Sequence, residues 1–129
     1  MDTPALRLVV GMRVVPDAPD GILCWSGRLG DESGVPVNVI LDDEPMTAID
    51  VAFIDRICAD ADRLLAVAAG AAGLTGDPGH WDPEMTFRSG ENWEVRFTEA
   101  PAPTELGLLV VFAGDRVTEI DDLADWDDA

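Results

Sequence analysis

Lysine, tyrosine and glutamine are absent from this 129-residue chain, and histidine occurs only once. The eight basic residues are therefore all arginines, and they stand against 26 acidic residues for a formal net charge of −18. Such a field repels nucleic-acid phosphates and anionic lipid, and it speeds association with cationic surfaces. We therefore expect no direct binding of nucleic acid or membrane, and we expect a basic protein as the partner.

Cysteine is also scarce, since Cys24 and Cys58 are the two in the chain. They form neither a close pair nor a larger framework, so we interpret both as small buried hydrophobic residues. No run reaches the roughly 18 consecutive apolar residues of a membrane span, and the first residues lack the pattern of a secretory signal. These absences predict a cytoplasmic protein, or else one exported without a visible signal.

The remaining composition is that of an ordinary globular protein, with 47% hydrophobic and 26% charged residues. The acidity is thus not accompanied by the low hydrophobicity of disordered chains. The length suits one domain, and we predict a single α+β domain over residues 1–129 with an acidic C-terminal end at about 121–129. Solubility, high salt or a GC-rich genome would also explain the acidity, which leaves its role in binding open.

Alternating apolar residues and turn signals predict a mainly antiparallel sheet of six to seven strands in two meanders. The first meander comprises Leu6–Val15, with a bulge or bend at Gly11, then Ile22–Leu29, and then Val35–Asp42, where Pro36 favours an edge position. The second contains a hairpin, a near-continuous apolar run that predicts a central strand buried on both faces, and a final strand. Its strands are Glu84–Arg88, Trp93–Thr98, Leu106–Phe112 and Val117–Ile120.

Between the two meanders the sequence predicts one long amphipathic helix packed against the sheet. Thr47 is the expected N-cap, and Asp50 occupies the capping-box position. Apolar residues recur from there at three- and four-residue spacing and form one stripe: Ile49, Phe53, Ile57, Ala61, Leu64, Leu65, Ala68 and Ala72.

Two acidic groupings invite a test for metal binding. Asp77, His80 and Asp82 fall in one short loop, and Asp42 to Glu44 follow a strand. Neither grouping has the ligand set of a zinc site or the spacing of an EF-hand, so we predict no metal and no cofactor.

The motifs of nucleophilic and nucleotide enzymes are missing as well. There is no Gly-x-Ser-x-Gly, no phosphate-binding loop and no dinucleotide fingerprint, and His80 would have to serve any Ser–His or Cys–His pair. We therefore predict no catalytic residues, while an enzyme with an acid/base pair near His80 stays open as an alternative.

The four tryptophans divide by position. Trp25 and Trp93 lie within predicted strands and are expected in the core, whereas Trp81 lies in a loop and Trp126 in the acidic C-terminal segment at about 121–129. Tryptophan is a frequent anchor of protein interfaces, so the second pair is assigned to partner binding. The full set of predicted partner-binding residues is Asp42, Asp43, Glu44, Trp81, Asp121, Asp122, Asp125, Trp126, Asp127 and Asp128.

Several segments carry a resemblance: Trp25-Ser26-Gly27, the strand Trp93–Phe97, the hairpin Leu106–Arg116, and Asp121-Asp122-Leu123. In these segments and in the order of its elements, the chain resembles small acidic bacterial domains, some of which look like the immunity proteins that accompany polymorphic toxins. The resemblance implies an immunity- or antitoxin-type inhibitor that docks on a basic toxin domain and blocks it. A small structural or assembly subunit that is acidic for solubility is the alternative from another class.

Overall fold

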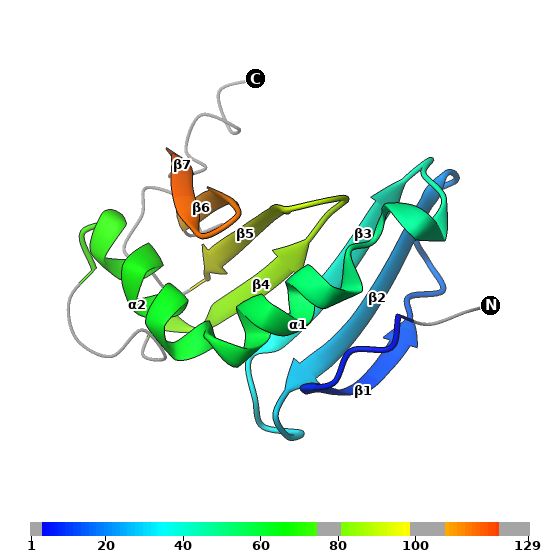
Figure 1. Ribbon diagram of the computed structural model, residues 1–129, viewed down its shortest axis with the longest axis horizontal. Coiled ribbons are helices and arrows are strands. Elements are labelled where there is room, and N and C mark those ends of the chain that lie inside the picture. The colour runs from blue at the N-terminus through cyan, green and yellow to red at the C-terminus, as the bar shows by residue number, and fades with distance from the viewer. Residues whose placement is uncertain (1–3, 75–80, 99–107, 122–129) are drawn as a thin grey trace.

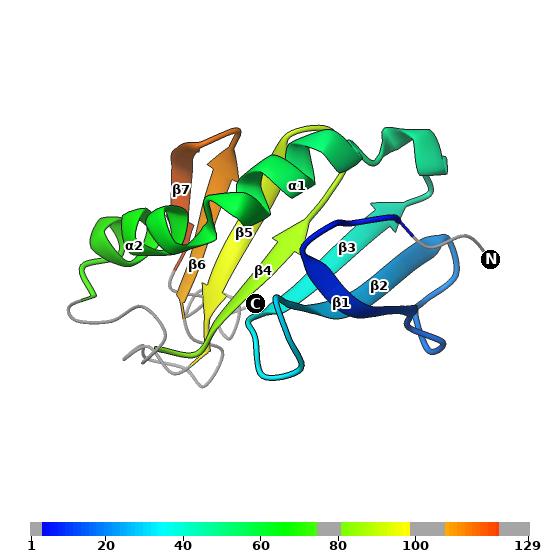
Figure 2. The ribbon, with the colours of Figure 1, turned by 60° about the horizontal axis from the view of Figure 1, so that its bottom comes forward.

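The computed structural model of this chain describes residues 4–74, 81–98 and 108–121. Seven strands form one sheet in the order β1-β2-β3-β4-β5-β6-β7, and two helices lie across one of its faces (Figures 1 and 2). The predicted α+β class with a mainly antiparallel sheet is confirmed. The strands are β1 (Val9–Val14), β2 (Ile22–Leu29), β3 (Pro36–Asp42), β4 (Pro83–Phe87), β5 (Asn92–Phe97), β6 (Leu108–Ala113) and β7 (Arg116–Asp121).

The sheet consists of two antiparallel meanders joined side by side. Strands β1 to β3 form the first and β4 to β7 the second, and β3 pairs with β4 in parallel, with Val37 opposite Met85 and Val39 opposite Phe87. Parallel neighbours require a crossover connection. The 3-10 helix η1 (Met46–Ala48) and the helices α1 (Val51–Ala59) and α2 (Ala61–Ala71) lie within it.

The predicted edge position of the third strand is wrong, because β3 lies between β2 and β4 near the centre of the sheet. Pro36 is the first residue of β3, where it pairs with Arg28. Proline lacks the N–H that a strand interior needs, but the first position of a strand tolerates it.

The expectation of a strand buried on both faces within Leu106–Phe112 is also wrong. In β6 only Val110 and Phe112 are buried, while Leu109 and Val111 are half-buried on the face without helices. The bulge expected at Gly11 is present, since the β1–β2 register shifts between Val10 and Arg13.

The helical segment is not one long helix. It divides at Asp60, whose φ of −111° and ψ of 20° end α1 and begin α2. The outward faces carry Ala52, Ala66 and Val67 beside the charged residues, so the helices are not cleanly amphipathic. None of the helices within the described ranges is long and apolar enough to cross a membrane.

The N-cap of α1 is Asp50, not Thr47, which lies in η1. The Asp50 carboxylate accepts a hydrogen bond of 3.0 Å from the backbone N–H of Phe53, and so satisfies a donor that the first helical turn leaves free. We expect Asp50→Ala to lower the free energy of unfolding by about 1 kcal/mol, measured by urea denaturation. Asp50→Asn, which keeps an accepting oxygen, is the control and should cost less; equal losses would contradict the capping role.

The core lies between the helices and the inner face of the sheet. Trp25 and Trp93 are buried there, as predicted from their places in strands. Trp93 stacks between Phe87, at 5.4 Å between ring centroids, and Phe112, at 4.3 Å. The buried helix residues that face them are Phe53, Ile54, Ile57, Cys58, Ala61, Leu64, Leu65, Ala68 and Ala69.

Candidate functional site

Two acidic turns meet at one end of the sheet. Asp42 closes β3 opposite Ile22 at the start of β2, and the backbone N–H of Asp43 donates to the carbonyl of Gly21 over 2.6 Å. This bond joins the turn after β3 to the turn between β1 and β2, which contributes further carboxylates. We call the resulting group the acidic end: Asp17, Asp20, Asp42, Asp43 and Glu44.

The backbone at the acidic end has an unusual conformation. Asp43 adopts a left-handed φ of 55°, which aspartate tolerates better than most residues. The carboxylate of Glu44 accepts a hydrogen bond of 3.4 Å from the backbone N–H of Asp42. Glu44 is half-buried by this arrangement, whereas the other four carboxylates are exposed.

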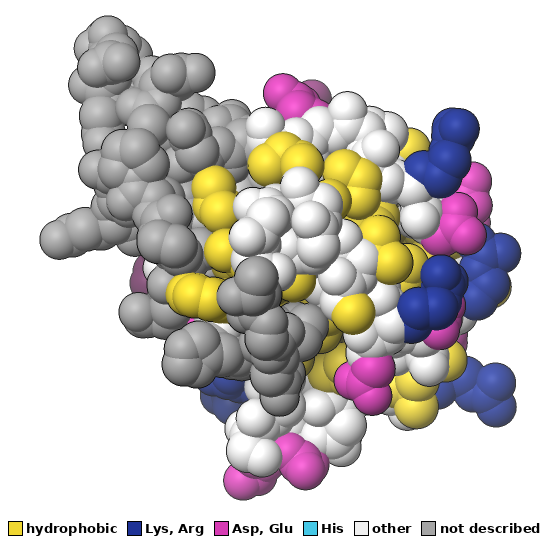
Figure 3. Space-filling view, turned by 90° about the vertical axis from the view of Figure 1, so that its left-hand side faces the viewer, with side chains coloured by type: hydrophobic (Ala, Val, Ile, Leu, Met, Phe, Trp, Pro, Cys, Tyr) yellow, Lys and Arg dark blue, Asp and Glu magenta, His cyan; other side chains and the backbone are white. Residues whose placement is uncertain are grey.

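No arginine neutralises the acidic end within the described ranges. The arginine–carboxylate pairs found there are Arg56–Glu91 at 3.6 Å, Arg63–Asp60, and Arg88–Glu94 at 2.6 Å. Elsewhere the charges are mixed: on the side of the molecule seen in Figure 3, arginine and acidic side chains alternate along one margin. The acidic end is therefore a local concentration of negative charge.

A shallow concavity of about 330 Å³ opens in the acidic end. Ile22 and Leu23 supply its apolar lining, and Asp43 and Glu44 supply carboxylates. A long cationic side chain buries its aliphatic stem along apolar surface while its charged head stays with acidic groups. The concavity thus has the chemistry to receive a lysine or arginine side chain.

Comparisons with known proteins add no assignment. No family model, no curated protein and no solved structure matches this chain.

Of the other predicted partner-binding residues, the structure describes only Trp81 and Asp121. Trp81 is half-buried and packs against the hydrophobic core. Asp121 ends β7, where its backbone pairs with Leu109. The rest of the acidic C-terminal set lies outside the described residues: Asp122, Asp125, Trp126, Asp127 and Asp128.

The loop that suggested metal or acid/base chemistry is described only in part. Asp77 and His80 lie outside the described residues, whereas Asp82 is exposed and accepts a hydrogen bond of 2.8 Å from the hydroxyl of Thr98. Across residues 4–74, 81–98 and 108–121, no three histidine, cysteine or acidic side chains converge as a metal site requires.

The two thiols lie in different surroundings. Cys58 is buried against the sheet, as expected, and burial together with the nearby Asp55 raises its pKa to about 12. Cys24, which was also expected to be buried, is only half-buried on the face without helices, and this partial burial raises its pKa as well. Because the thiolate is the nucleophilic form, neither environment activates a cysteine near neutral pH.

The face of the sheet opposite the helices carries a chain of polar contacts. Ser26 donates to the side chain of Asn38 over 2.5 Å, and Asn38 donates to Glu84 over 2.6 Å and to Thr86 over 3.4 Å. These residues stand side by side on β2, β3 and β4. Each amide or hydroxyl hydrogen bond therefore holds neighbouring strands together rather than reaching toward a ligand.

Part of the acidic end could have been found in the sequence. The run from Asp42 to Glu44 was assigned to partner binding from the sequence, but Asp17 and Asp20, in the turn between the first two predicted strands, were not. The signal was the β2–β3 turn at Gly30 to Gly34, because pairing the two strands backward from it places Asp42 opposite Ile22.

Proposed function

We propose that this chain is a non-catalytic binding protein of the immunity or antitoxin type, which docks its acidic end on a basic protein and thereby neutralises it. The observation that carries the proposal is the acidic end itself. Its five carboxylates lie on two turns that are joined by the hydrogen bond from Asp43 to Gly21. Two of the five, Asp43 and Glu44, line a small concavity, and none of the five is paired with an arginine in the described part of the chain.

The charge of the acidic end would raise the rate of docking and favour one orientation of the partner. A complementary field raises the association rate with a basic surface, and like-charged partners are rejected. The concavity beside Asp43 and Glu44 adds a defined place for one cationic side chain of the partner. An inhibitor of a toxic protein needs rapid capture, which electrostatic steering provides.

The test is binding to a basic domain encoded beside the gene for this chain, with association rates measured at about 0.1 M and about 1 M salt. The Debye length falls from about 10 Å to about 3 Å over that range, so steering by exposed charges is largely lost. We expect the triple variant Asp42→Asn, Asp43→Asn, Glu44→Gln to weaken binding about tenfold or more at the lower salt, mainly through slower association.

A matched control removes three exposed acids that lie outside the acidic end, on α2 and the β6–β7 hairpin, with Asp62→Asn, Asp115→Asn and Glu119→Gln. Both variants change the net charge equally, so a loss confined to the first assigns binding to the acidic end. Equal losses would show that only the overall charge matters, and unchanged binding in both would overturn the electrostatic docking.

Two further measurements distinguish the alternatives from the proposed function. A structural subunit that is acidic for solubility predicts self-association and little salt dependence, which sedimentation of the purified chain detects. An enzyme dependent on His80 predicts an activity that His80→Ala abolishes.

A further inference from the structure

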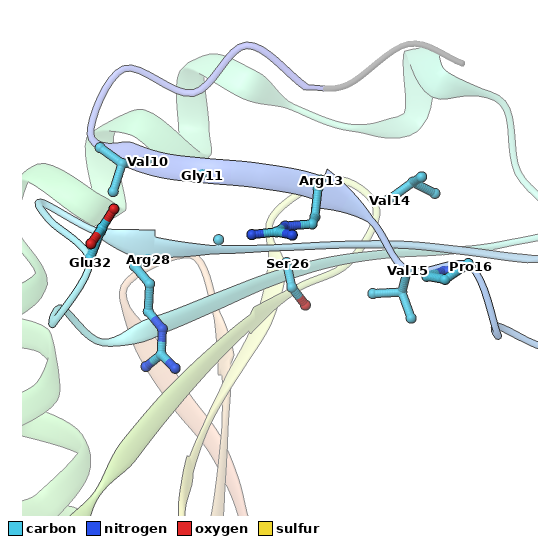
Figure 4. Close-up of a pocket in the computed structure, with 10 residues that line it drawn as sticks. Val10, Gly11, Arg13, Val14, Val15, Pro16, Ser26, Arg28 and Glu32 are labelled. Carbon is cyan, nitrogen blue, oxygen red and sulfur yellow. The ribbon is translucent and has the colours of Figure 1, made fainter.

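A second, larger concavity of about 560 Å³ lies along β1 and β2, and its lining reaches Pro16, next to Asp17 of the acidic end (Figure 4). Val10, Val14, Val15 and Pro16 give it apolar walls. Its volume is in the range of pockets that take small organic ligands, which is roughly 300–1,000 Å³. Its lining includes two arginines, Arg13 and Arg28, and one acid, Glu32.

The concavity exists because β1 is bulged. Gly11 and Met12 stand together opposite the single residue Gly27, and Gly11 adopts a φ of +67°. At Gly27 the strands approach so closely that a Cβ would lie 2.7 Å from Val9 Cγ1 and 2.9 Å from the carbonyl oxygen of Val10. A bulge increases local twist and re-aims side chains, and here it turns Arg13 over β2.

Arg13 and Arg28 are diagonal neighbours across the bulge. Arg13 pairs with Ser26, and Arg28 lies two residues further along β2 on the same side of the sheet. Figure 4 shows the Arg13 guanidinium directed toward the Arg28 side of the pocket, with Arg28 and Ser26 pointing to the same side of β2. Diagonal pairs on a sheet are within reach of long side chains.

Neither guanidinium has a carboxylate partner in the described part of the chain, although acids outnumber arginines there by eighteen to eight. Arg28 donates one hydrogen bond of 3.3 Å to the carbonyl of Gly34. The hydroxyl hydrogen of Ser26 is already given to Asn38. The two arginines are thus the charged donors available to a ligand.

We propose that this pocket binds a carboxylate carried on a short apolar stem. A planar guanidinium matches a carboxylate in a two-point geometry, and the valine walls match the stem. A phosphate would carry nearly twice the charge into a chain of −18, with Glu32 lining the same pocket, so the field disfavours it. The inference does not depend on docking by the acidic end, because the two sites attract groups of opposite sign.

Butyrate is the first probe, titrated into the labelled full-length protein at fixed salt and followed through backbone amide shifts. We expect saturable shifts at Gly11 and Gly27, and no saturation with 1-butanol. Arg13→Gln and Arg28→Gln should each weaken butyrate binding about tenfold, since each removes a charge-assisted pair of hydrogen bonds. Both arginines are exposed, so the variants should keep the native spectrum elsewhere.

Arg116→Gln is the matched control, because Arg116 is exposed on the opposite edge strand and lies outside the pocket. The proposal is overturned if butyrate does not saturate, if butanol binds equally, or if Arg116→Gln weakens binding as much as the pocket variants do.

A comparison of N-acetyl-leucine with N-acetyl-leucinamide identifies the source of the carboxylate. If N-acetyl-leucine binds at least tenfold more tightly than butyrate, and its amide does not bind, the ligand is a peptide C-terminus. Equal affinities for butyrate and N-acetyl-leucine assign the pocket to free organic acids.

Discussion

Trp93→Ala is expected to lower the free energy of unfolding by about 3–5 kcal/mol, the usual cost of replacing a buried tryptophan by alanine. The side chain is 1% exposed and is held between the rings of Phe87 and Phe112. Its indole N–H donates to the carbonyl of Gly114 over 2.6 Å. Truncation therefore leaves a cavity, removes two ring contacts and strips that carbonyl of its partner. Urea denaturation followed by circular dichroism measures the change.

Trp93→Phe is the control for this prediction. Phenylalanine keeps much of the apolar volume and the stacking on β4 and β6 but loses the hydrogen bond, so we expect a smaller loss than for alanine. A loss below about 1 kcal/mol for Trp93→Ala would mean that the ring is not packed as described.

Gly34→Ala is expected to be the most costly of the glycine substitutions, at about 3 kcal/mol, the upper end of the usual cost of overpacking. A Cβ at this position would overlap the carbonyl oxygen of Leu29 and lie 2.7 Å from its carbon. The turn between β2 and β3 has little freedom to relax. The N–H of Gly34 is bonded to Asp31, and the N–H of Leu29 is bonded to Val35.

Gly70→Ala is the matched control for Gly34→Ala, measured in the same urea titration. Gly70 lies in α2, where a Cβ would meet no neighbouring atom within 4 Å. Alanine also has a higher helix propensity than glycine. This change should raise the free energy of unfolding by about 0.5–1 kcal/mol. Equal effects of the two substitutions would contradict the close approach at Gly34.

The parts of the fold that could be predicted were those set by nearby residues. Alternation of apolar residues located the strands, and the burial of Trp25 followed from its place in one of them. The place of β3 in the sheet could not be predicted in the same way, because it depends on pairing with β4 residues that lie 48 positions further along the chain. Pro36 was a misleading signal, since its missing N–H falls at the first residue of the strand.

The division of the helix shows another limit. The apolar stripe continues across Asp60 without a change of spacing, so periodicity predicted one helix. Aspartate competes for backbone groups and favours helix ends, and Asp60 also holds Arg63 through its carboxylate. For the N-cap, Thr47 and Asp50 are both suitable residue types, and local sequence did not decide between them.

In the candidate sites too, residues adjacent in the chain could be predicted together, whereas residues brought together by strand pairing could not. Asp42 to Glu44 could be selected because they are adjacent in the chain, while Asp17 and Asp20 join them only through strand register. Arg13 pairs with Ser26 and comes near Arg28 because of the bulge at Gly11, and the sequence indicated a bulge or bend there without giving the register that it produces. Both sites are formed by residues that lie far apart in the chain, and a single sequence indicates such contacts only weakly.

The parallel junction between β3 and β4 has a mechanical consequence. It is joined by three residue pairs, against seven between β2 and β3, so few backbone bonds cross it. The hydrogen bonds of Asn38 to Glu84 and Thr86 fasten one face of this seam, and the helices span the other. We therefore expect the two meanders to behave as separate cooperative units. Force applied across the sheet would separate β3 from β4 before it disrupted either meander.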